Sequence, residues 1–123
     1  MRTITIILRS FLGLIFFVFG LNGFLHFLTM PAQPPSAGAF FGALAATGYM
    51  LPLIMSTEII GGALLLTGFL VPLALVMLAP VIVNIVAFHL FLAPGGLPLA
   101  IVVAALELAL AWLHGEAFRS LAK

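Results

Sequence analysis

Apolar residues fill four long stretches of this chain, and proline and glycine mark the breaks between them. The stretches are residues 10–28, 51–70, 71–92 and 99–114. A helix of about 20 mostly apolar residues is long enough to cross the hydrocarbon core of a bilayer. We therefore predict an all-α integral membrane protein, in which residues 1–123 form one antiparallel four-helix transmembrane bundle.

Proline and glycine mark the breaks between these spans. Prolines cluster in residues 31–35, after the first span, and residues 94–98 read Pro-Gly-Gly-Leu-Pro before the fourth. Neither sequence continues a helix readily. Between the second and third spans, Gly68 and Pro72 are the only turn signals. We therefore predict a short turn at that point.

A shorter helix is predicted between the first and second spans, over residues 37–47. Ser36 is suited to cap its first turn, and its length is too short to cross a bilayer. Gly38, Gly42 and Ala46 are spaced four apart, which gives one face small enough for another backbone to approach. We expect an interfacial helix at one end of the bundle, with an ordered loop as the alternative.

Composition supports lipid as the surroundings. Hydrophobic residues make up 65% of the chain and charged residues 6%, so too few polar side chains exist to cover a soluble core of this size. The lipid bilayer is thus an expected partner. The four basic residues lie near the chain ends and form no phosphate-binding face, which argues against nucleic acid. The absence of cysteine excludes disulfides, thiolate metal sites and a thiol relay within this chain.

Basic residues predict the orientation. Arg2 and Arg9 flank the first span, Arg119 and Lys123 follow the last, and both long loops between spans contain no lysine or arginine. The positive-inside tendency then places both termini in the cytoplasm. We further expect the membrane to be the inner membrane of a bacterial cell. No small-x-small cleavage site follows the first apolar stretch, so we expect a retained helix and not a signal peptide.

Six polar side chains interrupt the otherwise apolar spans. They are Asn22, His26, Glu58, Asn84, His89 and Glu107. A polar or ionisable group inside a membrane is costly, so each is a candidate for ligand binding or proton relay. With a rise of about 1.5 Å per residue, we expect all of them in the outer half of the bundle, around one polar cavity.

Each of these side chains also has a purely structural interpretation. Asn22 and Asn84 are suited to hydrogen bonds between helices, and His26 and His89 can extend to the interface. The two carboxyl groups must be protonated, paired or facing water. For Glu58, we expect a histidine partner, either His26 or His89.

Pro80 is expected to kink the third span because it cannot donate to the carbonyl of Val76. Asn84 and His89 lie about 140° apart around a straight helix. They can share a cavity only if the kink at Pro80 brings the two side chains toward one side of the helix, or if His89 points toward the following loop. Zinc, iron and manganese suit this set of residue types, but no Glu-x-x-His pair occurs, so we predict no metal site.

Several segments resemble those of the DoxX family. Arg9 precedes the first span, residues 16–23 read Phe-Phe-Val-Phe-Gly-Leu-Asn-Gly, residues 58–62 read Glu-Ile-Ile-Gly-Gly, and residues 83–89 read Val-Asn-Ile-Val-Ala-Phe-His. The family comprises four-helix membrane proteins named after a subunit of a thiosulfate:quinone oxidoreductase. The positions that the resemblance implies for function are Asn22, Glu58, Asn84 and His89.

Together these features predict a DoxX-like membrane subunit or anchor of a redox-linked complex, with a polar cavity in its outer half. The alternative is a subunit of an oxidoreductase that binds a quinone-type small molecule, with electrons supplied by a soluble or membrane redox partner. If chemistry occurs, we expect a subunit of a quinone-linked enzyme and not a stand-alone enzyme. A small transporter is the third hypothesis, and assembly as a homo-oligomer is left open.

Overall fold

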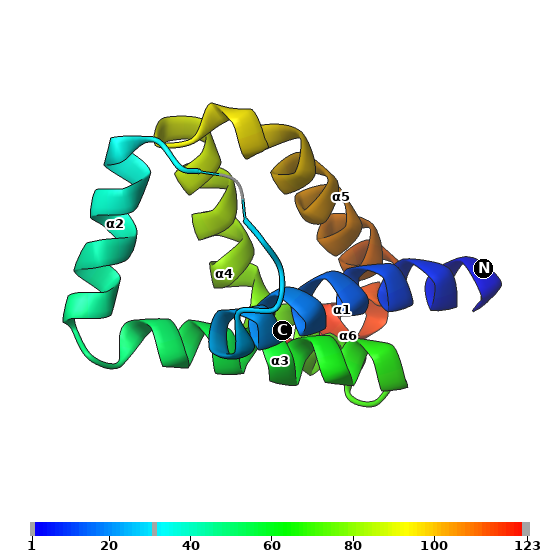
Figure 1. Cartoon of the computed structure of the whole chain (residues 1–123). Helices are drawn as coiled ribbons and strands as arrows, with labels where there is room; N and C mark the ends of the chain where they lie inside the picture. Colours follow the sequence, from blue (N-terminus) through cyan, green and yellow to red (C-terminus); the bar gives the residue numbers. More distant parts are fainter. Residues whose placement is uncertain (1, 31, 122–123) are drawn as a thin grey trace.

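The computed structural model describes residues 2–30 and 32–121, which are largely helical and contain no β-strand (Figure 1). The elements are α1 (Arg2–Leu25), α2 (Pro35–Ala46), α3 (Met50–Thr67), α4 (Val71–Phe91), the 3-10 turn η1 (Pro94–Gly96), α5 (Leu97–Leu113) and α6 (Gly115–Leu121). Four segments are long and apolar enough to cross a membrane, namely α1, α3, α4 and η1 with α5. The predicted all-α membrane bundle, with a shorter helix between its first two spans, is confirmed.

Helices α1 and α3 lie side by side and form the most extensive contact between two elements (Figure 1). Glycines allow this approach. A Cβ atom added to Gly62 would lie 2.6 Å from the backbone nitrogen of Phe17, and one added to Gly13 would lie 2.8 Å from the carbonyl oxygen of Gly62. These two backbones therefore touch directly, as small residues permit in membrane helices.

The turn between α3 and α4 is short, as predicted from the sequence. Gly68 has a φ of 77° and donates its backbone N–H to the carbonyl of Leu64, 2.9 Å away, which ends α3. Leu70, with a φ of 53°, also adopts the left-handed conformation and precedes the first residue of α4. Two residues with positive φ reverse the chain within three positions.

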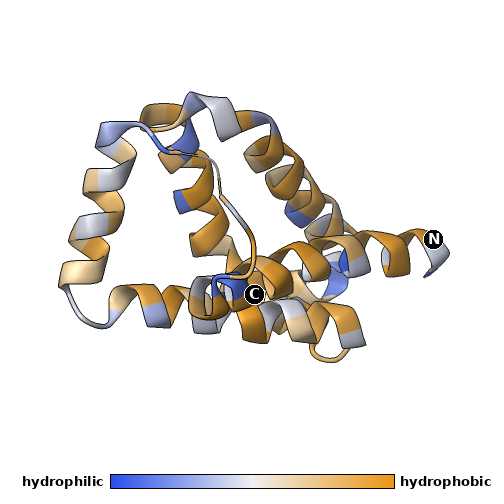
Figure 2. Ribbon diagram, in the orientation of Figure 1, coloured by the Kyte–Doolittle hydropathy of each residue, from blue (hydrophilic) through white to orange (hydrophobic). Residues whose placement is uncertain are grey.

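The hydrophobic core lies where α1, α3, α4 and α5 meet. Its largest fully buried side chains are Phe16, Leu12, Leu65, Leu75, Leu78 and Leu110. Many large apolar side chains remain exposed outside it, and hydrophobic residues dominate all four long helices (Figure 2). An apolar surface of this extent is typical of helices whose outer faces contact lipid.

Helix α2 differs in detail from the prediction. It begins at Pro35 instead of residue 37, and Ser36 does not cap it, because the Ser36 hydroxyl donates to the carbonyl of Leu92 at the end of α4, 3.4 Å away. A Cβ added to Gly38 or Gly42 meets no atom within 4 Å. The small face of α2 is thus uncovered within the described chain.

The helix boundaries differ from the predicted spans by one to three residues at most ends, and by more at the start of α1. Helix α1 begins at Arg2, eight residues before the first predicted span. The residues before position 10 mix polar and apolar types and include Arg9, so they did not read as part of an apolar span. Their helix propensity nevertheless allows the helix to extend over them. At the other end, the short helix α6 follows α5 after a break at His114. The apolar pattern did not predict α6 because it is short and mixes polar with apolar residues.

Candidate functional site

A cavity of about 310 Å³ lies among α1, α2, α3, α4 and α5. Its walls are mostly aliphatic and aromatic, and four polar side chains interrupt them. The polar residues are Gln33, Glu58, Asn84 and His89. This volume is at the lower end of the range of pockets that hold small ligands, and a few polar groups on apolar walls are typical of such pockets.

Glu58 and Asn84 face this cavity from neighbouring helices, α3 and α4. Glu58 is partly buried and Asn84 is exposed. Within residues 2–30 and 32–121, neither side chain forms a hydrogen bond or an ion pair. Their carboxyl and amide groups are therefore free to bind a polar atom of a ligand.

His89 reaches the cavity from the last turn of α4. Its Nδ1 atom lies 2.8 Å from the carbonyl oxygen of Ile85. Because that oxygen can only accept, Nδ1 carries the hydrogen, and Nε2 of a neutral ring is left as an acceptor. The Nε2–Cδ2 edge lies against Gly96, where an added Cβ would overlap it.

The contact with Gly96 also explains how Asn84 and His89 line one cavity although they lie on different faces of α4. His89 turns toward η1, which was one of the two arrangements that the sequence allowed. Helix α4 continues through Pro80, which lies outside the lining of this cavity.

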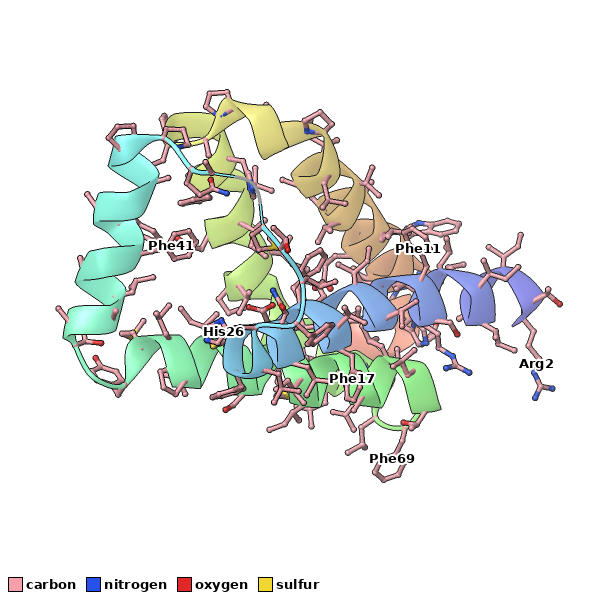
Figure 3. All side chains as sticks on the ribbon, viewed as in Figure 1. Arg2, Phe11, Phe17, His26, Phe41 and Phe69 are labelled. Atoms are coloured by element: carbon pink, nitrogen blue, oxygen red, sulfur yellow. The ribbon has the colours of Figure 1, made fainter. Side chains whose placement is uncertain are left out.

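An aromatic cluster joins α2 to α4 beside the polar wall. The ring centroid of Phe88 lies 5.6 Å from that of Phe40 and 5.0 Å from that of Phe41. Figure 3 shows Phe41 extending from α2 toward α4. All three rings line the cavity, so a planar apolar ligand would have aromatic surface to stack on.

Asn22 and His26 do not line this cavity. Asn22 is buried, with 7% of its surface exposed, and its Oδ1 atom accepts a hydrogen bond from the backbone N–H of Leu28, 2.7 Å away. It therefore fixes the chain as it leaves α1. In place of the predicted hydrogen bond between helices, Asn22 forms one between α1 and the loop that follows it.

His26 lies just beyond the end of α1 and is exposed (Figure 3). The expectation that His26 lies within the first helical span is wrong, because α1 ends at Leu25 and the φ of 53° at His26 takes the chain out of the helix. Nor does the expected carboxylate–histidine pair form. Within the described residues, no histidine lies within ion-pair distance of Glu58.

Glu107 is separated from the other polar residues. It lines a different groove between α4 and α5, and the lining of that groove has no residue in common with the cavity. The predicted convergence of all six polar residues on one cavity is therefore wrong for Asn22, His26 and Glu107. Depth along a helix does not determine which face a side chain occupies.

Sequence reasoning missed Gln33 and the aromatic side of the cavity. Gln33 lies in the loop before α2, where its type and position resemble those of any polar loop residue. Phe40 and Phe41 lie off the small-residue stripe of α2, and this was the available signal that a second face of that helix lines the cavity. In the described part of the chain, no three His, Asp or Glu side chains gather as a metal site would need.

The fold and the cavity define a class: a helical membrane protein with four candidate spans and a small apolar cavity edged by a carboxyl, an amide and an imidazole group. The DoxX family model matches residues 4–91, which is most of the chain. This protein belongs to the DoxX family. The matched region runs from the first turn of α1 to the end of α4 and so ends before Glu107. Searches of curated proteins and of solved structures returned no match.

Proposed function

We propose that this protein is a membrane subunit of a redox-linked complex, and that its cavity binds a small quinone-type molecule. One observation carries the proposal: Glu58, Asn84 and His89 face a single cavity whose other walls are mainly apolar and aromatic. A lipid-soluble ring with polar oxygens matches both features.

The polar groups are suited to the two carbonyl oxygens of a quinone. The amide of Asn84 donates through its NH₂ group, and the carboxyl of Glu58 donates when it is protonated. Neither group has a partner in the described chain that a ligand would need to displace. The ring of the ligand would lie against Phe88 and its neighbours on α2.

His89 has a different role in this proposal. A neutral ring with its hydrogen on Nδ1 offers Nε2 as an acceptor, so it suits a hydroxyl group of the reduced form. Quinone reduction consumes protons, which Glu58 and His89 can transfer. The electrons would come from a soluble or membrane partner, because no cofactor-binding motif is evident in this chain.

We further propose that the protein resides in a bacterial inner membrane with both termini in the cytoplasm. Arg2, Arg9 and Arg119 lie toward the two ends of the chain, and the loops between α1 and α3 and between α4 and α5 contain no basic residue. This distribution follows the positive-inside tendency. Attachment of a cysteine reporter to each loop, with labelling by an impermeant maleimide on intact cells, tests it.

A titration of decylubiquinone into the protein in lipid nanodiscs tests the ligand proposal. Replacing Glu58 by Leu or Asn84 by Leu removes a donor, and each change should weaken binding about fivefold or more, since a lost ligand hydrogen bond in an apolar pocket costs about 1–3 kcal/mol. Glu58→Gln retains a donor and should bind within a few-fold of the wild type. Unchanged binding in both Leu variants would contradict the proposal.

The second candidate function is a non-catalytic anchor that docks a partner protein. The uncovered Gly38 and Gly42 on α2 favour it, because such a face admits a second helix closely. Gly42→Leu should then release the partner in a co-purification while decylubiquinone binding stays absent in every form of the protein. Binding that is specific to the wild-type cavity supports the ligand proposal instead.

A further inference from the structure

The carboxyl group of Glu107 lies in an apolar groove with no partner for one of its oxygens. The groove has a volume of about 490 Å³ and runs between α4 and α5, with Phe118 of α6 also in its wall. Only 8% of the Glu107 surface is exposed, and its Oε1 atom is buried without a hydrogen bond in the described chain. An unpaired buried carboxyl oxygen is costly, so its retention calls for a ligand.

The surroundings restrict what such a ligand can be. Apart from Glu107, every residue that lines the groove is aliphatic or aromatic, and no other titratable group is present there. Val83 and Leu108 also line the groove, and their exposed fractions are 68% and 70%. The groove is thus accessible from the lipid side, and a ligand must be largely apolar to enter.

We propose that this groove binds a lipophilic monoamine, whose nitrogen pairs with the carboxyl group of Glu107. The carboxyl and the amine share one proton, so the pair has no net charge whichever of the two atoms holds it. A neutral pair is the arrangement that an apolar groove without another charge tolerates best. The hydrogen bond between ammonium and carboxylate is also stronger than one between neutral groups.

Other ligand classes fit less well. A fatty acid or a phosphate-bearing headgroup would bring a second negative charge, and the lining contains no basic residue to balance it. A diamine would leave one charge unpaired among aliphatic side chains. An alcohol would form only a neutral hydrogen bond. The site is separate from the proposed quinone cavity, and Glu107 itself lies beyond the region matched by the family model, although the α4 wall of the groove lies within it.

Protection from a hydrophobic carbodiimide tests this proposal in the unmodified protein. Dicyclohexylcarbodiimide adds to the O–H of a protonated carboxyl group, and the adduct rearranges to a stable N-acylurea without losing any atom. Peptide mass spectrometry then measures the labelling rates of Glu107 and Glu58 separately in nanodiscs. The probe is N,N-dimethyldecylamine, a tertiary amine that cannot couple to the activated carboxyl, and decanol is the matched control.

The expected result is protection of Glu107 by the amine alone. At ten times its half-protecting concentration, the amine should slow labelling of Glu107 about tenfold and leave Glu58 unaffected. Three results would overturn the proposal. Equal protection by decanol would mean that the groove holds an alkyl chain only, equal protection of Glu58 would mean a general effect on the bilayer, and an unreactive Glu107 would mean that the groove is closed to such ligands.

Discussion

The guanidinium group of Arg9 in α1 donates a hydrogen bond to the backbone carbonyl of Leu65, 2.8 Å away, near the C-terminal end of α3. The same Nη1 atom also lies 3.0 Å from the carbonyl oxygen of Leu66. These carbonyls belong to the last turn of α3, where the helix itself supplies no N–H partner and the helix dipole is negative. Arg9 therefore joins α1 to the end of α3 and satisfies the exposed end of that helix.

Replacing Arg9 by Met should destabilise the protein by about 2 kcal/mol, because hydrogen bonds from a charged donor to partly buried carbonyls are lost. Arg9→Lys should lose less stability than Arg9→Met because it retains the charge. It should still be less stable than the wild type, since lysine cannot present the same fork of donors. Unfolding in a titration with sodium dodecyl sulfate, followed by circular dichroism, measures both. Arg2→Met is the control, because Arg2 extends away from the other helices (Figure 3). An equal loss for Arg2→Met would contradict this role of Arg9.

Gly62→Ala should separate α1 from α3. The new methyl group would lie 2.6 Å from the backbone nitrogen of Phe17, which cannot move without shifting the helix, and overpacking of this kind costs about 1–3 kcal/mol. Gly42→Ala is a matched change, because it too lies inside a helix but meets nothing within 4 Å. It should leave stability unchanged or raise it by up to about 1 kcal/mol through helix propensity. Similar effects of the two changes in the same unfolding titration would rule out the glycine contact.

Asn22→Ala should loosen the chain after α1 by removing the acceptor for the N–H of Leu28. A lost hydrogen bond of about 1 kcal/mol corresponds to roughly fivefold faster opening. Hydrogen–deuterium exchange at the Leu28 amide measures it directly. Asn84→Ala serves as the control, since the Asn84 side chain forms no hydrogen bond within the described residues. If exchange at Leu28 is the same in both variants, Asn22 does not hold this loop.

Gly96→Ala should displace the His89 ring, because the added methyl group would overlap its Cδ2 and Nε2 atoms. If the cavity binds a quinone-type ligand, decylubiquinone should then dissociate faster, by about tenfold for a loss near 1.4 kcal/mol. Gly95→Ala changes the adjacent residue in the same turn but meets no atom within 4 Å. A comparable effect of Gly95→Ala would show that the turn itself matters and not the position of His89.

The sequence predicted the helices well because the bilayer requires long apolar stretches, and breaks rich in proline and glycine separate most of them. It also grouped Glu58, Asn84 and His89, which line one cavity, although their function stays a prediction. It failed for Glu107, because its depth in α5 was estimated but its rotation about the helix axis depends on how α4 and α5 pack.

Two further features depend on backbone details that composition does not reveal. The positive φ of His26 ends α1 and moves that side chain out of the predicted cluster. The sequence identifies Arg9 as an orientation signal and as part of the family resemblance, but not as a residue that binds the end of a helix 56 positions later in the chain. A contact between residues so far apart becomes evident only when α1 and α3 are seen side by side (Figure 1).

Native mass spectrometry of the protein released gently from its own membrane tests the central claim most directly. The wild type is compared with Glu58→Leu, which alters the cavity, and with Glu107→Leu, which removes the other carboxyl group within a candidate span. The account predicts an adduct with the mass of a membrane quinone on the wild type and on Glu107→Leu, and its loss from Glu58→Leu. A wild-type protein without such an adduct, or one whose adduct persists in Glu58→Leu, would contradict it.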